Sequence, residues 1–360
     1  MKSVRLSQKS LLPFLCNNIM TDFEKVIDFK NLYQAYKKAK SGKGFKNSSA
    51  KFEINALDGI NILKEQLEHK QYRVDEYQEF YVYEPKKRLI AASTFKDKIV
   101  QHSLCDNVLL PTLKDVFIRN NFAGQKGKGT LFGLNTLKDN MISFYQQYGG
   151  GFILKGDISK FFYSIDHQIL KQIIRKYFSD ENILWLCDLI IDSTQGKGLP
   201  LGNQTSQVFA LLYLSDLDHY IVNDLKIEFY GRYMDDFYLI HKNKKYLKKC
   251  LCDIKSILNS LGLSLNEKTE IIPFRQGIKF LGFHTYVTAA GNIECRLNNK
   301  NKNNALRRYR RMAKLVKTGS LSEEKFIECF RSWKSHALFG NCNELIENFQ
   351  NEIDIILSEE

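Results

Sequence analysis

The chain has 360 residues, and its 44% hydrophobic content is enough for a sizeable buried core, which excludes a disordered chain. It carries 53 Lys and Arg residues and 40 Asp and Glu residues, which gives a formal charge of +13. This charge favours a polyanionic partner such as nucleic acid, and an anionic membrane surface is the alternative partner. No run of eighteen apolar residues occurs, so we expect a soluble cytoplasmic protein without a membrane-spanning helix.

The first half of the chain predicts helices and loops that lead to one strand. Residues 1–20 carry little structural signal, and residues 25–75 mix short helical patterns with a stretch at 41–49 that is typical of a loop. The apolar segment 151–156 ends at Asp157 and is followed by aromatic residues. This pattern predicts a strand that ends at a carboxylate.

The second half predicts a hairpin between helices. Segment 207–220 is apolar enough for a buried helix, and residues 244–261 repeat leucines at helical spacing. Aromatic and β-branched residues at 229–240 predict two strands, with Asp235 and Asp236 at or near their turn. Residues 301–317 predict a basic helix, either for a nucleic-acid backbone or as a solvated charged face. Alternating helices and strands predict an α+β fold.

Three carboxylates are the strongest chemical signal in the sequence. Asp235 and Asp236 are adjacent within an aromatic run, where two acids are costly without a cation, although Asp is also an ordinary turn residue. Together with Asp157 they would suit two Mg²⁺ ions, with Mn²⁺ as a substitute. Such a pair of ions clamps the attacking and leaving oxygens of phosphoryl transfer.

The order of motifs resembles that of the reverse transcriptases. That family carries an aspartate after one strand and Tyr-x-Asp-Asp in a hairpin, which correspond to Asp157 and Tyr233–Asp236. Further blocks follow the family's order at 87–101, 121–130, 198–207, 263–269 and 279–283. The resemblance covers about residues 25–340 and implies a right-hand polymerase with a ferredoxin-like antiparallel palm sheet and mainly helical fingers and thumb. We expect an N-terminal extension at 1–24, fingers with the start of the palm at 25–150, palm at 151–285 and thumb at 286–360.

The resemblance also implies an RNA-directed DNA polymerase and roles for individual residues. The three aspartates and the backbone carbonyl of Ile158 would bind the metal ions, and Lys268 would approach the departing pyrophosphate as a proton donor. Phe162 would be the steric gate against a ribose 2′-hydroxyl, or else an ordinary core aromatic. The nucleotide site would comprise Lys87, Arg88, Ile158, Phe162, Leu201, Gly202 and Gln207. The primer grip would comprise Phe280, Leu281, Gly282 and Phe283. The nucleic-acid backbone would be contacted by Arg307, Arg308, Arg310 and Arg311.

One block is similar to a particular group within the family. Most reverse transcriptases have Gln-Gly and Ser-Pro where this chain has Leu201-Gly202 and Ser206-Gln207, and this variant resembles the enzymes of diversity-generating retroelements. The resemblance implies cDNA synthesis with errors at adenines, which diversifies a variable protein gene. An aliphatic Leu201 would remove a hydrogen-bond donor beside the incoming nucleotide and relax discrimination. Alternatively, Leu201 packs under a loop and Gln207 is an ordinary residue at a helix start.

The expected partners follow from the same resemblance. They are template RNA, primer, cDNA and dNTPs, together with a small basic accessory protein that forms a ring, in a prokaryotic or phage setting and without a membrane. A retron or phage-defence reverse transcriptase is the nearest alternative, and a group II intron-like enzyme comes next. A catalytically silent RNA-binding scaffold is an alternative from a different class.

Overall fold

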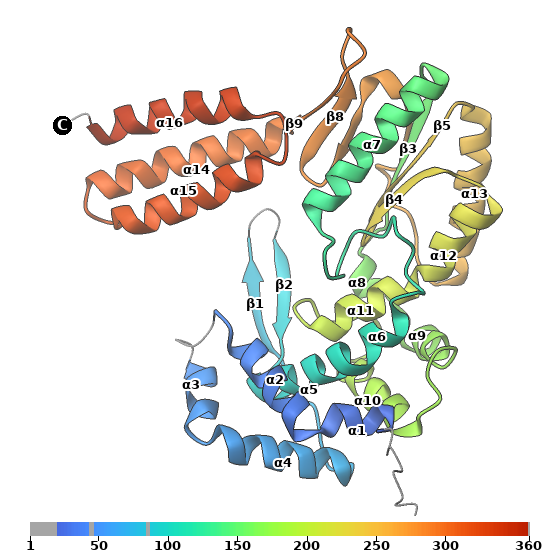
Figure 1. The fold of residues 1–360 in the computed structure, drawn as a ribbon, viewed down its shortest axis with the longest axis vertical. Helices are drawn as coiled ribbons and strands as arrows, with labels where there is room; N and C mark the ends of the chain where they lie inside the picture. Colours follow the sequence, from blue (N-terminus) through green and yellow to red (C-terminus); the bar gives the residue numbers. More distant parts are fainter. Residues whose placement is uncertain (1–19, 43–46, 84–86, 359–360) are drawn as a thin grey trace, which may run out of the picture.

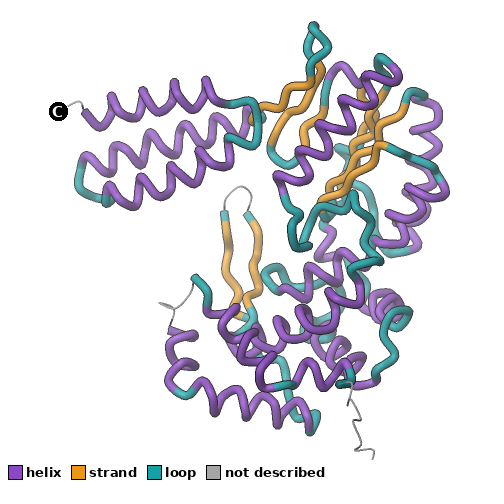
Figure 2. Tube along the Cα trace, viewed as in Figure 1, coloured by secondary structure: helices purple, strands orange, loops and turns teal. Residues whose placement is uncertain are grey.

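The computed structural model describes residues 20–42, 47–83 and 87–358 (Figure 1). Most of the extension expected at 1–24 and the middle of the loop expected at 41–49 lie outside the described residues. The chain forms an N-terminal helical part with a projecting hairpin, a central part with two sheets, and a C-terminal helical bundle. In Figure 2 the strands lie in the hairpin and the central part, whereas the C-terminal part is helical.

The N-terminal part is a helical cluster from which one hairpin projects. Its elements are α1 (Asp22–Ile27), α2 (Phe29–Lys40), α3 (Asn47–Ile54), α4 (Ala56–Glu68), β1 (Gln78–Val82), β2 (Arg88–Ala92), α5 (Phe95–Leu104), a π-helical turn (Cys105–Leu109) and α6 (Leu110–Leu113). Helix α1 begins ahead of the boundary expected at residue 25, because Thr21 and Glu24 form a capping box around its first turn. Its buried residues join a core shared with α9, α10 and α11.

The central sheet is antiparallel and has the strand order β4-β5-β3-β6. The elements of this region are α7 (Thr130–Tyr148), β3 (Phe152–Asp157), α8 (Phe161–Ser164), α9 (His167–Ile174), α10 (Glu181–Ile191), α11 (Gln204–Tyr213), α12 (Ser215–His219), a π-helical turn (Tyr220–Asp224), β4 (Phe229–Tyr233), β5 (Asp236–His241), α13 (Lys244–Ser260) and β6 (Glu270–Pro273). Helices connect β3 to β4 and β5 to β6, so the chain follows a β-α-β-β-α-β course.

Helices cover both faces of this sheet. On one face, α13 buries a stripe at helical spacing that consists of Leu247, Cys250, Ile254 and Leu258. On the other face, α7 buries side chains against β3, β4 and β5 (Figure 1). At the end of the sheet, where β3 stops and the hairpin between β4 and β5 turns, the acidic residues Asp157 and Asp236 lie on adjacent strands.

A second sheet leads to the C-terminal bundle. It follows a 3₁₀ turn (Phe274–Gln276) and has the order β7 (Ile278–Phe280), β8 (Phe283–Val287) and β9 (Ile293–Leu297). Strand β8 runs across the palm–thumb boundary expected at 285 and 286, because β9 completes the same sheet. The expected boundary therefore falls within β8, and the helical bundle begins at α14 (Asn299–Lys317).

The C-terminal bundle consists of α14, α15 (Glu323–Ala337) and α16 (Asn343–Ser358). Its core is mainly aromatic and contains Tyr309, Phe326, Phe330, Trp333 and Phe349. In Figure 1 the hairpin β1–β2 points from the N-terminal part toward this bundle. Within the described ranges, no helix combines the length and the apolar character that crossing a membrane requires.

Candidate active site

Two of the predicted carboxylates are cross-strand partners. Asp157 ends β3, Asp236 begins β5, and the register of the two strands pairs them directly. The backbone N–H and C=O of Asp157 bond to Thr269 and Asn266, on the side away from β5. Asp157 and Asp236 therefore form a non-hydrogen-bonded pair, in which the Cα atoms lie about 4.5 Å apart and the side chains share one face.

Asp235 lies in the turn that joins β4 to β5. Its carbonyl accepts a hydrogen bond of 3.1 Å from the N–H of Ile158, the residue after Asp157. This bond ties the hairpin turn to the end of β3. The fold thus brings together all three aspartates that the sequence singles out.

Asp236 sits in a place that disfavours a bare negative charge. The pKa of Asp236 is raised to about 7, first because burial disfavours the charged form and also because Asp157 and Asp235 are negative, while Lys155 opposes the shift. Lys155 Nζ lies 3.3 Å from Asp236 Oδ1. That oxygen is buried and forms no hydrogen bond, although the side chain as a whole is 25% exposed. Lys155 is the one cationic partner of this oxygen among the described residues, and a metal ion in its place would stabilise the carboxylate charge that burial disfavours.

The donor set fits hard divalent cations such as Mg²⁺, which prefer carboxylate oxygens. The buried Oδ1 of Asp236, which forms no hydrogen bond and has only the Lys155 ammonium at 3.3 Å, supports this fit, because a bound ion would stabilise the charge that burial disfavours. Among the described residues, no three His, Cys, Asp or Glu side chains already stand in a metal-binding cluster. Binding would therefore draw the carboxylates together and displace Lys155 from Asp236.

The hairpin turn is strained and is held by a buried arginine. Met234 has a φ of +55°, a left-handed conformation that costs a residue with a side chain about 1–2 kcal/mol. Arg232 Nη1 donates a hydrogen bond of 2.9 Å to the Met234 carbonyl oxygen. The same guanidinium is fully buried and binds Asp218 through Nε at 2.7 Å and Nη2 at 2.5 Å. Asp218 also accepts a bond of 2.6 Å from the Tyr230 hydroxyl.

Sequence reasoning missed this arginine pair and also Lys155. The usable signal was Arg232, a lone charge within a buried aromatic strand; Asp218 gave no comparable signal, because Asp216 lies two residues before it on the same helix. Charged residues are rarely fully buried unless they are paired. For Lys155 the signal was the strand period, which places residues two apart on the same face.

Three separate elements that carry predicted nucleotide-site residues contact one another. The N–H of Leu199 donates to the Phe162 carbonyl oxygen at 2.7 Å, so the turn that carries Leu201 lies against α8. Tyr163 Oη donates to the Leu89 carbonyl oxygen at 3.2 Å, which links α8 to β2. A Cβ at Gly202 would lie 3.5 Å from Ile90, so this turn also contacts β2.

The predicted nucleotide contacts differ in exposure. Lys87 and Arg88 are exposed at the start of β2, and Lys87 Nζ lies 4.4 Å from the Tyr81 ring centroid. Leu201 is half-buried, whereas Gln207 is exposed on α11. Ile158 is buried, so only its backbone can contribute to a metal or nucleotide site.

Lys268 lies on a turn that is bonded to Asp157. Its N–H donates to Asn266 Oδ1 at 3.0 Å, and the Asn266 N–H donates to the Asp157 carbonyl oxygen at 2.7 Å. The lysine side chain is exposed. This segment therefore places a mobile cation next to the end of β3.

The predicted primer grip forms the tight turn between β7 and β8. Phe280 and Phe283 are buried cross-strand partners, whereas Leu281 and Gly282 are the turn residues with φ of +50° and +89°. The Phe280 ring packs edge-on against Tyr238 at 5.3 Å, and Tyr238 shares the sheet face of Asp236. The Gly282 carbonyl oxygen accepts a bond of 3.1 Å from the N–H of Asn298, just before α14.

The basic helix α14 faces the hairpin of the N-terminal part. Arg307, Arg308 and Arg311 line a cavity of about 720 Å³ together with Tyr83, a 67% exposed residue after β1. Arg310 points elsewhere and forms an ion pair with Glu352 on α16, where Nη2 donates at 2.9 Å. Three of the four predicted arginines therefore border one opening.

Comparison with known proteins defines the family. Residues 69–285 match the family described as reverse transcriptase (RNA-dependent DNA polymerase). The match spans more than half of the chain, and the protein therefore belongs to this family. A comparison with curated proteins finds no match.

Two solved structures illustrate the structural similarity. One is telomerase from Candida albicans in complex with a TWJ fragment of telomeric RNA, with 13% identity, a TM-score of 0.47, and coverage of 80% of this chain and 56% of that chain. The other is apo telomerase from Candida tropicalis truncated from its C-terminal domain, with 15% identity, a TM-score of 0.42, and coverage of 64% and 58%. The chain thus spans somewhat more than half the length of these two proteins.

Proposed function

We propose that the protein is an RNA-directed DNA polymerase whose palm is the central sheet. The N-terminal helices and the hairpin β1–β2 would be the fingers, and the bundle α14–α16 would be the thumb. The observation that carries this proposal is the pairing of Asp157 with Asp236 beside the Asp235 turn in a chain of the reverse transcriptase family. The cofactor would be a pair of Mg²⁺ ions, with Mn²⁺ as a substitute.

In this proposal the chain's own residues position the reactants. Asp157, Asp235 and Asp236 would hold the ions, aided by the Ile158 carbonyl oxygen. When bound, such ions lower the pKa of the primer 3′-hydroxyl and neutralise the triphosphate. Lys268 would donate a proton at the departing pyrophosphate oxygen. The contacts of Phe162 with the Leu199 turn support its placement as the gate beside the nucleotide ribose.

The primer and template would lie between fingers and thumb. The turn Leu281-Gly282 would support the primer end, since it joins the palm face at Tyr238 to the start of α14. Arg307, Arg308 and Arg311 would neutralise backbone phosphates in the cavity that Tyr83 borders. Lys87 and Arg88 would meet the triphosphate from β2.

We further propose that the enzyme makes adenine-mutagenic cDNA within a diversity-generating retroelement. The support is Leu201, which carries no hydrogen-bonding side-chain group and lies on a turn in contact with both α8 and β2. A nucleotide there would be checked by shape more than by directional bonds, which relaxes discrimination. The proposal includes a prokaryotic cytoplasm and a small basic ring-forming accessory protein as partner.

The test is cDNA synthesis followed by sequencing. Purified protein is incubated with Mg²⁺, dNTPs and a primed RNA that contains every base, alongside the Asp235→Ala/Asp236→Ala double variant. The proposal expects cDNA from the wild type alone, with errors concentrated opposite adenine. Accurate cDNA would refute the mutagenic role, and equal product from both proteins would refute catalysis at these acids.

A further inference from the structure

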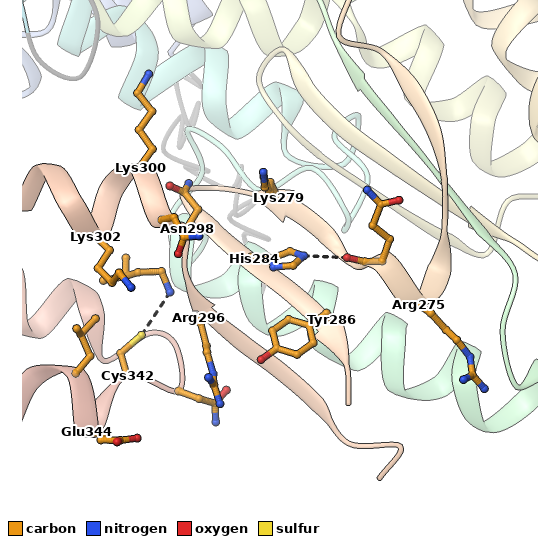
Figure 3. Close-up of a pocket in the computed structure, with 15 residues that line it drawn as sticks. Arg275, Lys279, His284, Tyr286, Arg296, Asn298, Lys300, Lys302, Cys342 and Glu344 are labelled. Carbon is orange, nitrogen blue, oxygen red and sulfur yellow. Dashed lines mark hydrogen bonds between the residues drawn. The ribbon is translucent and has the colours of Figure 1, made fainter. Parts of the chain in front are cut away.

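A cavity lies on the outer face of the second sheet. It measures about 830 Å³, within the range of ligand sites, and is bordered by the sheet β7–β8–β9, the start of α14 and the start of α16 (Figure 3). None of the functions assigned above uses it. We name it the basic groove, and the residues that define it are Lys279, His284, Tyr286, Arg296, Lys300 and Lys302.

The basic groove faces away from the carboxylates. Lys279, His284 and Arg296 are consecutive cross-strand partners, so their side chains share one face of the sheet. The opposite face carries Phe280 and Phe283, which are buried, and Phe280 contacts the palm ring Tyr238. The thickness of the sheet therefore separates this groove from the active site.

Its charge suits a polyanion. Five basic side chains line the cavity, namely Arg275, Lys279, Arg296, Lys300 and Lys302, together with the carboxylate of Glu344. One of the five, Arg296, is paired with Glu294 through Nη2 at 2.6 Å, so the basic side chains still exceed the carboxylates. Lys279 and Lys300 are exposed. Among the described residues, neither is part of an ion pair that would neutralise it. Cations spaced along a groove are the usual means of following a phosphate backbone.

The floor of the groove adds an aromatic platform. The rings of His284 and Tyr286 lie 5.1 Å apart with an interplanar angle of 32°. His284 Nε2 is fixed by the Gln276 carbonyl oxygen at 3.0 Å, and the Tyr286 hydroxyl donates to Glu294 at 3.0 Å. Figure 3 shows both rings on β8, between Lys279 and Arg296. Bases of a single strand stack on such rings, whereas a duplex keeps its bases inside.

We propose that the basic groove binds a single-stranded segment of nucleic acid outside the primer–template duplex. The proposal rests on the proposed polymerase function only in that such an enzyme handles both a template and a product strand. The strand is either template RNA beyond the duplex or displaced cDNA, because both present phosphates and unstacked bases. The groove would hold this strand while the active site works on the duplex.

The test measures binding of a second strand by enzyme that already holds a short primer–template duplex. Fluorescence anisotropy follows labelled oligouridylate and, separately, oligodeoxythymidylate over a range of salt concentrations. Lys279→Gln/Arg296→Gln should lower the slope of log affinity against log salt by about 0.7 to 1.4. Each lost phosphate contact on a single strand removes about 0.7, and Arg296, which is already paired with Glu294, contributes less than a full contact. The matched control is Lys248→Gln/Lys249→Gln, which removes the same charge from the exposed side of α13.

A second pair of variants tests stacking independently of charge. Tyr286→Leu should weaken binding about tenfold without changing the salt slope, whereas Tyr286→Phe should bind as the wild type does. Tighter binding of oligouridylate would assign the groove to template RNA, and tighter binding of oligodeoxythymidylate would assign it to cDNA; either result supports the proposal. The proposal would be overturned if the control variant lost binding to the same extent. It would also be overturned if polyglutamate competed as strongly as oligouridylate.

Primer extension on the same short duplex separates this proposal from the proposed function. The groove variants should extend it at the wild-type rate, because their side chains lie on the far face of the sheet. A wild-type protein without extension activity would refute the polymerase and leave the binding result to stand by itself. Unchanged strand binding in both groove variants would refute the groove and leave the polymerase intact.

Discussion

The buried pair of Arg232 and Asp218 provides a way to separate positioning of the catalytic turn from stability of the fold. Arg232→Met alone should unfold the protein readily, because it leaves a buried carboxylate without its cation, which costs about 3–5 kcal/mol. The triple variant Arg232→Met/Asp218→Leu/Tyr230→Phe removes the ion pair and the Tyr230 hydroxyl, and leaves the buried Asn121 without its long bond of 3.4 Å to Asp218. Its stability should be close to that of the wild type, since apolar replacements of buried ion pairs are often neutral.

The triple variant should nevertheless be a poor enzyme. It lacks the hydrogen bond to the Met234 carbonyl oxygen, which as a bond from a charged donor contributes about 1.5–3 kcal/mol. The left-handed Met234 then relaxes and moves Asp235 and Asp236. A cost of about 1.4–2.8 kcal/mol on the barrier corresponds to a ten- to hundredfold lower kcat.

The assay is primer extension with kcat and KM measured separately, together with thermal unfolding. We expect a lower kcat, a nearly unchanged KM for dNTP and a nearly unchanged Tm. Adding Met234→Gly to the triple variant should restore part of the lost kcat, because glycine adopts a positive φ without strain. A folded triple variant with wild-type kcat would refute the positioning role of Arg232.

Three further predictions concern other residues of the site. The pKa of Asp236 is raised to about 7 from 3.8, so protonated Asp236 stabilises the folded state fully below pH 4, and this stability is lost as pH rises through 7. In the presence of a chelator, Tm should therefore fall across this window by the equivalent of up to about 4 kcal/mol. The variant Asp236→Asn should show a smaller fall. Gly156→Ala should lower the free energy of unfolding in denaturant by about 1–3 kcal/mol, because the added Cβ would lie 2.1 Å from the Phe237 ring. An unchanged free energy of unfolding would show that β3 and β5 shift apart without cost and would reject this prediction. Leu201→Gln should lower the error frequency opposite adenine in sequenced cDNA by restoring a donor at the nucleotide, and an unchanged error spectrum would reject Leu201 as its cause.

The elements that depend on local patterns were predictable from the sequence. The leucine spacing at 244–261 predicted α13, and the alternating aromatic segment 229–240 predicted the hairpin with its acidic turn. Asp157 at a strand end was predicted because an apolar run stops there. Each of these predictions depends only on local sequence, either on the spacing of apolar residues or on the end of an apolar run.

Features that depend on distant contacts were not predictable in the same way. Sheet pairing decides that Asp157 faces Asp236 directly and that β9 joins β8, and neither register can be read from the strands themselves. The network of Arg232, Asp218 and Tyr230 requires a helix and a strand to meet, and only Arg232, a lone charge in its strand, signals it in the sequence. The ion pair of Arg310 with Glu352 likewise arises from the packing of α14 on α16.

The most direct test of the central claim is the rate of DNA synthesis on a primed RNA by Asp157→Asn. This substitution keeps the shape of the side chain, so Tm should stay near the wild-type value. If the cross-strand carboxylates hold the metal ions, the extension rate should fall by roughly a hundredfold or more, the loss typical when one transition-state contact is removed. A folded Asp157→Asn protein that copies RNA at the wild-type rate would contradict the account.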